Sequence, residues 1–180
     1  MTRTLDAQDV DDLAVGAWVL GTGGGGSPYL NHLNMQRIAA EGMQFELIDP
    51  QELDDKAKVA VVSTMGAPLV MQERLQDPRD VARAVQVMAE HTGSTFDAVM
   101  ATEIGGSNAF QPLMASAHLG IPIVDADAMG RAYPEAQMTS FAIGGLQPWP
   151  LALVDPRGVE AIVTHVPTWK WMERASRALT

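Results

Sequence analysis

Residues 97–127 read DAVMATEIGGSNAFQPLMASAHLGIPIVDAD, and this stretch decides the fold. An apolar run at 97–102 is typical of a buried strand, and so is IPIVDAD at 121–127. Between them, residues 108–119 have the apolar spacing of a helix, which Gly120 ends. A strand, a helix and a second strand in this order indicate the crossover of a parallel sheet.

The sequence before this stretch repeats the alternation of helix and strand. The spacing of apolar residues predicts helices over 10–20, 28–42 and 77–93. Short apolar runs at 44–48 (QFELI) and 58–63 (KVAVVS) predict two more strands. Short strands that alternate with helices and are apolar on both faces are typical of a mostly parallel sheet flanked by helices. The predicted fold class is therefore α/β.

The character of the chain changes towards its carboxyl end. A further helix is expected over 134–143. LALV at 151–154 and VEAIV at 159–163 then flank Asp-Pro-Arg-Gly, where proline and glycine suit a type I turn, and this pattern predicts an antiparallel hairpin. A terminal helix is expected from about residue 168. One face of it would hold Trp169, Met172, Ala175 and Leu179.

The composition excludes several classes of protein. The chain has 180 residues, with 12 Lys and Arg against 22 Asp and Glu and a formal net charge of −10. Such a surface repels a phosphate backbone and an acidic membrane face, so neither nucleic acid nor a membrane is an expected partner. The absence of cysteine excludes disulfides and thiol nucleophiles. No secretory signal or membrane-spanning apolar run is present, and we expect a cytoplasmic protein.

Three loops follow predicted strands at one edge of the sheet. They are residues 64–68, 102–108 and 125–131, and each is rich in glycine or small residues. Ligands of open parallel sheets bind beyond the carboxyl ends of the strands. The sequence therefore places the candidate site where these three loops converge.

The most conspicuous loop lies earlier, at Gly21–Pro28. Pro28 is expected to begin a helix, with Ser27 as its N-cap. Glycines allow close approach of backbone N–H groups to a ligand, and a helix N-terminus favours negative charge. The candidate substrate-binding residues of this loop are Gly23, Gly24, Gly25, Gly26 and Ser27. The alternative is a flexible connection between two helices.

Three carboxylates, Glu103, Asp125 and Asp127, lie on adjacent loops of the same edge. Each is a candidate catalytic residue, as a general base or as a group that orients water. Together they are candidates to ligate a hard cation such as Mg²⁺, so a divalent metal is possible although no cofactor is firmly implied. The alternative for Asp125 is a structural role, in which it accepts backbone N–H bonds within its loop.

Arg131 and Asn108 are further candidates for substrate binding. Arg131 is suited to clamp a substrate carboxylate, and its alternative is a salt bridge to Glu103 or Asp127. Asn108 has an alternative role as the N-cap of its helix. The four histidines show no metal-ligand spacing, so a histidine zinc site is not expected.

Four motifs, taken in order, resemble those of the family catalogued as domain of unknown function 917, which is associated with the name S-methyl-thiohydantoin desulfurase, amino-terminal domain. The resemblance covers about residues 8–166. The motifs are GTGGGGSPY at 21–29, MGAP at 65–68, EIGGSNAFQPL at 103–113 and DADAMGRAYPEAQMTS at 125–140.

The resemblance carries implications for domains and partners. It implies that residues 1–166 form an α/β amino-terminal domain and that 167–180 form a helix leading to a missing β-rich carboxyl-terminal domain. That helix could instead fold back on its own sheet. The resemblance also implies action on five-membered cyclic ureides, such as hydantoins or thiohydantoins, and a partner subunit of the hydantoinase or oxoprolinase type.

The leading hypothesis is a hydrolase-type domain for such rings, with possible desulfuration. Asp127 or Glu103 would act as base, and N–H groups of the glycine loop would stabilise the developing anion. The alternative is a non-catalytic ligand-binding or regulatory subunit of a hydantoinase- or oxoprolinase-like complex. A nucleotide-binding ATPase is a third hypothesis, which rests on the glycine loop alone. A homo-oligomer is also possible, because the apolar hairpin and terminal helix leave room for an interface.

Overall fold

A five-stranded sheet forms the centre of the protein in a computed structural model, which describes residues 2–180. The strand order is β1-β2-β5-β4-β3. β1 pairs with β2 in antiparallel fashion, whereas the other three pairs are parallel. The strands are β1 (Arg3–Leu5), β2 (Phe45–Ile48), β3 (Val59–Val62), β4 (Ala98–Ala101) and β5 (Ile123–Val124).

The sheet confirms the predicted α/β class and the four predicted strands. The sequence pattern does not predict β1, a three-residue strand at the edge of the sheet. Its burial is low, so it lacks the apolar signal on which the other strands were identified.

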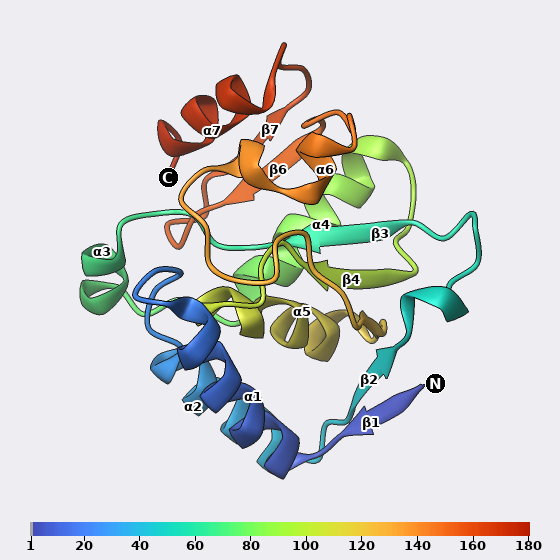
Figure 1. Cartoon of the computed structure of the whole chain (residues 1–180), viewed down its shortest axis with the longest axis vertical. Helices are drawn as coiled ribbons and strands as arrows, with labels where there is room; N and C mark the ends of the chain where they lie inside the picture. Colours follow the sequence, from blue (N-terminus) through green and yellow to red (C-terminus); the bar gives the residue numbers. More distant parts are fainter. Residues whose placement is uncertain (1) are drawn as a thin grey trace.

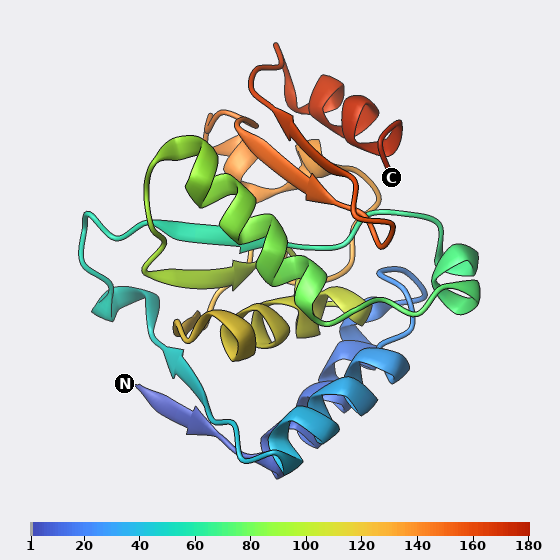
Figure 2. The same ribbon diagram turned by 180° about the vertical axis from the view of Figure 1, so that it is seen from behind.

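Helices cover one face of the sheet, as Figures 1 and 2 show. In Figure 2, α4 lies in front of β3 and β4, α5 lies below β4, and the pair formed by α1 and α2 packs beneath α5. The main hydrophobic core lies between these helices and the sheet. The four helices are α1 (Ala7–Gly21), α2 (Tyr29–Ala40), α4 (Arg79–Thr92) and α5 (Gln111–Leu119).

The opposite face is covered by the chain that follows β5. Phe141, on the short helix α6 (Ser140–Ile143), packs with Ala126 against a small cluster that includes Met100 and Val124. Strand β4 is therefore buried on both sides, which is why its sequence is a continuous apolar run. The remaining short elements are α3 (Pro68–Glu73) and the 3₁₀ turns Pro50–Glu52, Gly106–Phe110 and Ala136–Met138.

Helix α1 is bounded by strong local signals. Asp6 and Asp9 form a capping box, in which each side chain accepts a hydrogen bond from the backbone N–H of the other, at 3.0 and 2.9 Å. The helix ends where Thr22 adopts the left-handed conformation, at φ 48°. The helix begins three residues before the predicted residue 10 and ends one residue after the predicted residue 20, so the rest of the glycine loop follows it directly.

Several predicted helix boundaries differ from the structure. Helix α2 begins at Tyr29, one residue later than expected, with Pro28 as its N-cap. The Ser27 hydroxyl still accepts a hydrogen bond from Tyr29 N, at 3.3 Å. The helix expected over 134–143 is instead a 3₁₀ turn followed by α6, because Thr139 is extended and its hydroxyl caps α6.

The hairpin and terminal helix are confirmed. Strands β6 (Leu151–Val154) and β7 (Glu160–Val163) pair antiparallel, and α7 (Trp169–Arg177) begins at Thr168 as N-cap. The helix packs on the hairpin and on residues 133–138, where Val166, Met172 and Ala136 form a third cluster. Of the predicted apolar face, Leu179 lies beyond the end of α7 and is 44% exposed. Among the described residues, no helix is long and apolar enough to cross a membrane.

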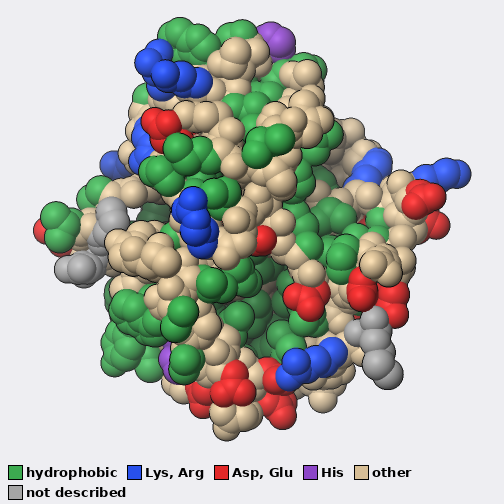
Figure 3. Space-filling view, in the orientation of Figure 1, with side chains coloured by type: hydrophobic (Ala, Val, Ile, Leu, Met, Phe, Trp, Pro, Cys, Tyr) green, Lys and Arg blue, Asp and Glu red, His purple; other side chains and the backbone are tan. Residues whose placement is uncertain are grey.

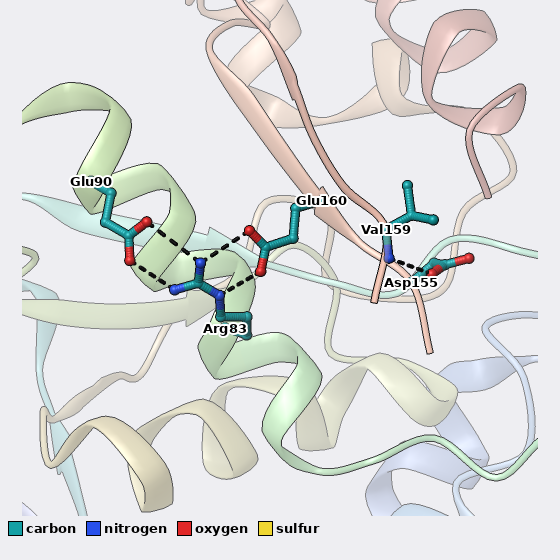
Figure 4. A network of polar contacts seen from close by, with 5 residues as sticks. All are labelled: Arg83, Glu90, Asp155, Val159 and Glu160. Carbon is teal, nitrogen blue, oxygen red and sulfur yellow. Dashed lines mark hydrogen bonds and ion pairs between the residues drawn. The ribbon is translucent and has the colours of Figure 1, made fainter. Parts of the chain in front are cut away.

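An arginine on α4 attaches the hairpin to the main body, as Figure 4 shows. Arg83 Nε and Nη2 donate to the two carboxylate oxygens of Glu160, at 2.6 and 3.0 Å. Arg83 Nη1 also donates to Glu90 on its own helix, at 2.7 Å. The hydrogen bonds from Arg83 to Glu160 hold the pKa of Glu160 below its usual 4.5. The pair is a bidentate contact between elements far apart in sequence.

Glu160→Gln is expected to lower the thermal midpoint slightly near neutral pH, because the ion pair is solvent-exposed. A lowered pKa in the folded state stabilises the fold above the unfolded value, here 4.5, and the contribution is lost as pH falls through the lowered value. In thermal melts from neutral pH down to about pH 3, the gap between wild type and variant should therefore close. A gap that stays constant over this range would contradict the role of the pair.

Candidate active site

A cavity of about 500 Å³ lies beyond the carboxyl ends of β3, β4 and β5, the edge at which the sequence places the site. The loops that follow these strands line it, together with the glycine loop that precedes α2 and the end of α7. On the face shown in Figure 3, basic side chains gather over α7, whereas acidic ones gather along the lower and right edges. The polar side chains that line the cavity include Thr64, Glu103, Asn108, Arg131, Glu173 and Arg177.

Glu103 lines the cavity although the residue is only 4% exposed. Its Oε1 accepts a hydrogen bond from Asn108 Nδ2 at 2.5 Å, and its Oε2 accepts one from Tyr133 N at 2.8 Å. Burial raises the pKa of Glu103, the two hydrogen bonds oppose the rise, and the charge of Asp127 adds to it. A carboxyl group with a raised pKa beside a cavity is suited to exchange a proton with a ligand.

Asn108 connects Glu103 to the loop after β3. Its Oδ1 accepts hydrogen bonds from Thr64 N at 2.7 Å and Thr64 Oγ1 at 2.9 Å. The residue before it is fixed by buried Asn31, whose Nδ2 donates to the carbonyl and hydroxyl oxygens of Ser107. Phe110, and not Asn108, is the N-cap of α5. Asn108 lines the cavity, but its amide atoms bind protein groups, so its role in substrate binding stays a prediction.

The glycine loop packs directly on the loop after β4. Ser107 N donates to Gly25 O at 2.8 Å. A Cβ on Gly25 would lie 2.6 Å from Gly105 O, and a Cβ on Gly105 would lie 2.4 Å from Ala132 N. These backbones approach so closely that only glycine fits, and the contact holds the wall of the cavity together.

The same loop leaves backbone donors available. Gly23, Gly25 and Gly26 have positive φ values of 85°, 70° and 75°. Within residues 2–180, their N–H groups donate to no hydrogen-bond partner, whereas Gly24 N donates to Gly21 O at 2.6 Å. All four glycines line the cavity, but Ser27 does not. N–H groups in such a turn are suited to bind an anion, and this role stays a prediction.

Asp127 and Asp125 do not line the cavity. The Asp127 carboxylate accepts hydrogen bonds from Ile104 N at 2.8 Å and from Gly130 N at 2.7 and 2.9 Å, so it ties its own loop to the loop after β4. Asp125 is exposed. The structure therefore favours Glu103 over both residues as the group that faces a ligand.

Asp127→Asn is expected to destabilise the protein by about 1 kcal/mol. The amide oxygen can take the place of Oδ2 and accept from both Ile104 N and Gly130 N, but the NH₂ group then takes the place of Oδ1 and lies donor against donor opposite Gly130 N. Denaturant unfolding measures the change, and the exposed Asp125→Asn variant, with an expected cost below about 0.5 kcal/mol, is the control. Equal costs for the two variants would contradict the structural role of Asp127.

Arg131 lines the cavity without a carboxylate partner among the residues that the structure describes. Its Nη1 donates to the carbonyl of Ala132 at 2.7 Å. The predicted alternative, a salt bridge to Glu103 or Asp127, is absent, because both carboxylates accept their hydrogen bonds from other donors. A guanidinium in this position is free to bind an anionic group of a ligand.

The sequence analysis missed the contribution of α7. Glu173 is 7% exposed and accepts hydrogen bonds from Ala136 N at 3.1 Å and Arg177 Nε at 2.6 Å. Glu173 and Arg177 both line the cavity. Their spacing of four residues on a helix was the available signal, although that pattern usually marks an exposed ion pair. Only the packing of α7 on residues 133–138 brings them to the site.

The described part of the chain holds no group of three or more His, Asp or Glu side chains close enough to bind a metal ion. The three predicted carboxylates thus do not form a common site. Glu103 faces the cavity, Asp127 binds loop backbone and Asp125 lies at the surface.

The cavity gathers the four motifs noted in the sequence, since all four contribute lining residues. The model of the S-Me-THD-like, N-terminal domain family matches residues 8–165. The chain belongs to this family. The motifs that mark this S-Me-THD-like domain are therefore those that build its cavity.

A solved structure supports the assignment of the fold. A crystal structure of a protein from Chromobacterium violaceum has 26% sequence identity to this S-Me-THD-like domain and a TM-score of 0.80. The match covers 98% of this chain and 49% of the other, so the chain spans about half the length of that protein. A search of curated proteins found no match.

Proposed function

We propose that this S-Me-THD-like domain hydrolyses five-membered cyclic ureides or their thio analogues in the cavity at the carboxyl ends of the strands. The observation that carries the proposal is Glu103, a buried carboxyl group with a raised pKa on the wall of the cavity. Available backbone donors and a cation without a carboxylate partner line the same cavity, at the glycine loop and at Arg131. Membership of the family supports the choice of ring.

The reaction starts with the addition of water to the thiocarbonyl carbon of a thiohydantoin. The water oxygen forms a bond to carbon, the electron pair of the C=S bond moves to sulfur, and Glu103 takes the proton of the water. Glycine-loop N–H groups stabilise the negative charge that develops on sulfur. Glu103 then returns its proton to the sulfur. The C–S bond breaks with its electron pair on sulfur, the hydroxyl group of the intermediate gives its proton to Glu103 and becomes the ring carbonyl, and sulfur leaves as hydrosulfide; Glu103 finally releases the proton to solvent.

Both oxygens of Glu103 retain a lone pair that can accept a proton. Each accepts one hydrogen bond, and a carboxylate offers about four lone-pair sites in total. The base must be ionised to accept the proton, so turnover should fall as pH decreases through a pKa above the usual 4.5. In this scheme, Arg131 holds a carboxylate substituent of the ring.

Sulfide release from 2-thiohydantoins, with and without a carboxylate arm, tests the proposal in the purified protein. We expect the wild type to release sulfide from the carboxylated ring, and Arg131→Ala to raise the KM for that ring. The control is Arg157→Ala, whose guanidinium pairs with Asp155 on the hairpin, and its KM should equal that of the wild type. Saturable binding of the rings without any release would favour the non-catalytic partner subunit instead. The absence of both binding and release would contradict the proposal.

A further inference from the structure

The hydrogen bonds that join Thr64, Asn108 and Glu103 run in one direction. Backbone N–H groups can only donate, so Thr64 N requires an acceptor atom opposite it. The amide of Asn108 meets this requirement with Oδ1, at 2.7 Å. Its other end is therefore the NH₂ group, which lies 2.5 Å from Glu103 Oε1. Flipping the amide would place donor against donor at Thr64 N.

The second contact to Glu103 has the same polarity. Tyr133 N can also only donate, and it lies 2.8 Å from Oε2. Glu103 therefore accepts a hydrogen bond at both oxygens, and a proton on this carboxyl group must use one of the remaining lone pairs. Both contacts favour the ionised form and offset part of the cost of burial.

Among the segments that make these contacts, the loop after β3 is packed least tightly. Asn108 is 7% exposed, and its neighbour Ser107 is held by Asn31. Thr64 is less buried and shares the cavity wall with Gly66, which has nothing within 4 Å of its Cβ position. A ligand that displaced this loop would remove both donors from Asn108 Oδ1 and free the amide to turn.

We propose that Thr64 and Asn108 are positioning residues, through which the loop after β3 sets how strongly Glu103 holds a proton. The expected effect on turnover rests on the proposed function, whereas the contacts among Thr64, Asn108 and Glu103 do not depend on it. Other charged or titratable groups near Glu103 stay in place in the variants below. They are Asp127 on the loop after β5, Tyr133, Arg131, and Glu173 and Arg177 on α7.

The test follows the Glu103 carboxyl group by NMR titration in protein with carboxyl-labelled glutamate, with the signal assigned by its loss in Glu103→Gln. Asn108→Ala removes the donor to Oε1 of Glu103, and the titration midpoint of Glu103 should rise by roughly one pH unit. Thr64→Val removes one of two donors to Oδ1 and should give a smaller rise, which Thr64→Ser should restore. Thr92→Val, which removes a hydroxyl bonded within α4, is the control and should not change the midpoint.

The acidic limb of the turnover profile should move by the same amount in each variant. Midpoints that are equal in wild type, Asn108→Ala and Thr64→Val would overturn the inference, even if the wild type hydrolyses its substrate. Midpoints that shift in a protein without turnover would support the inference and contradict the proposed function instead. If Asn108→Ala does not fold, the comparison of Thr64→Val with Thr64→Ser decides.

Discussion

Glu103→Gln is expected to lower turnover of a 2-thiohydantoin by about 100-fold or more, since a general acid–base group contributes roughly 10²–10⁴ to the rate. The amide cannot accept the proton of the attacking water. KM should change much less, because Glu103 acts on the water and not on the ring. Steady-state kinetics of sulfide release near neutral pH measure both quantities.

The substitution carries a structural cost that needs its own control. A glutamine places its NH₂ group opposite either Asn108 Nδ2 or Tyr133 N, both of which are donors. Glu103→Asp keeps the charge and withdraws the carboxylate by one methylene group, and it should also lose most of its turnover. Asp125→Asn, at an exposed carboxylate, should retain full turnover. A folded Glu103→Gln protein with wild-type turnover would contradict the assignment of the base.

Gly105→Ala is expected to destabilise the fold by roughly 3 kcal/mol or more, the largest stability effect that we predict. The backbone at Gly105 has an ordinary φ of −98°, so the cost comes from contacts alone. Its Cβ would lie 2.4 Å from Ala132 N and 2.5 Å from Leu20 O, and backbone atoms cannot move aside as a flexible side chain does. Chemical denaturation of the variant measures the loss.

Substitutions at two other glycines distinguish the cost of steric contact from the cost of backbone strain. Gly42 has φ 85° but nothing within 4 Å of its Cβ position, so Gly42→Ala should cost about 1 kcal/mol from strain alone. Gly16 lies inside α1 with open space around it, and Gly16→Ala should stabilise the protein by about 0.5–1 kcal/mol. A Gly105→Ala variant no less stable than Gly42→Ala would contradict the close contact of Gly105 with Leu20 and Ala132.

The sequence predicts the parallel core well because its signals are local. The apolar runs at 97–102 and 58–63 and the glycine at position 120 depend on neighbours in the chain, and the structure confirms the elements that they predict. The helix over 134–143 fails for a tertiary reason. Ala136 N donates to Glu173 on α7, which lies far along the chain, and buried Thr139 is extended and caps α6, so the helix does not continue through it.

The candidate site could be located from the sequence but not resolved in detail. Glu103 and Asp127 are similar in the sequence, since each is an acidic residue shortly after a buried strand. Their difference lies in which donors reach them. Backbone N–H groups of two loops occupy Asp127, whereas Glu103 retains access to the cavity. Glu173 and Arg177 reach the site only through packing of α7, which no local pattern encodes.

The most direct test of the proposed site is a crystal structure of the protein with hydantoin, the ring that desulfuration produces. We predict that the ring binds in the cavity, with one of its carbonyl carbons within reach of a water molecule that the Glu103 carboxylate holds and with the oxygen on that carbon towards N–H groups of the glycine loop. A ring bound elsewhere, such as the second cavity of about 550 Å³ between α2 and α4 that Arg37 and His118 line, would contradict the account.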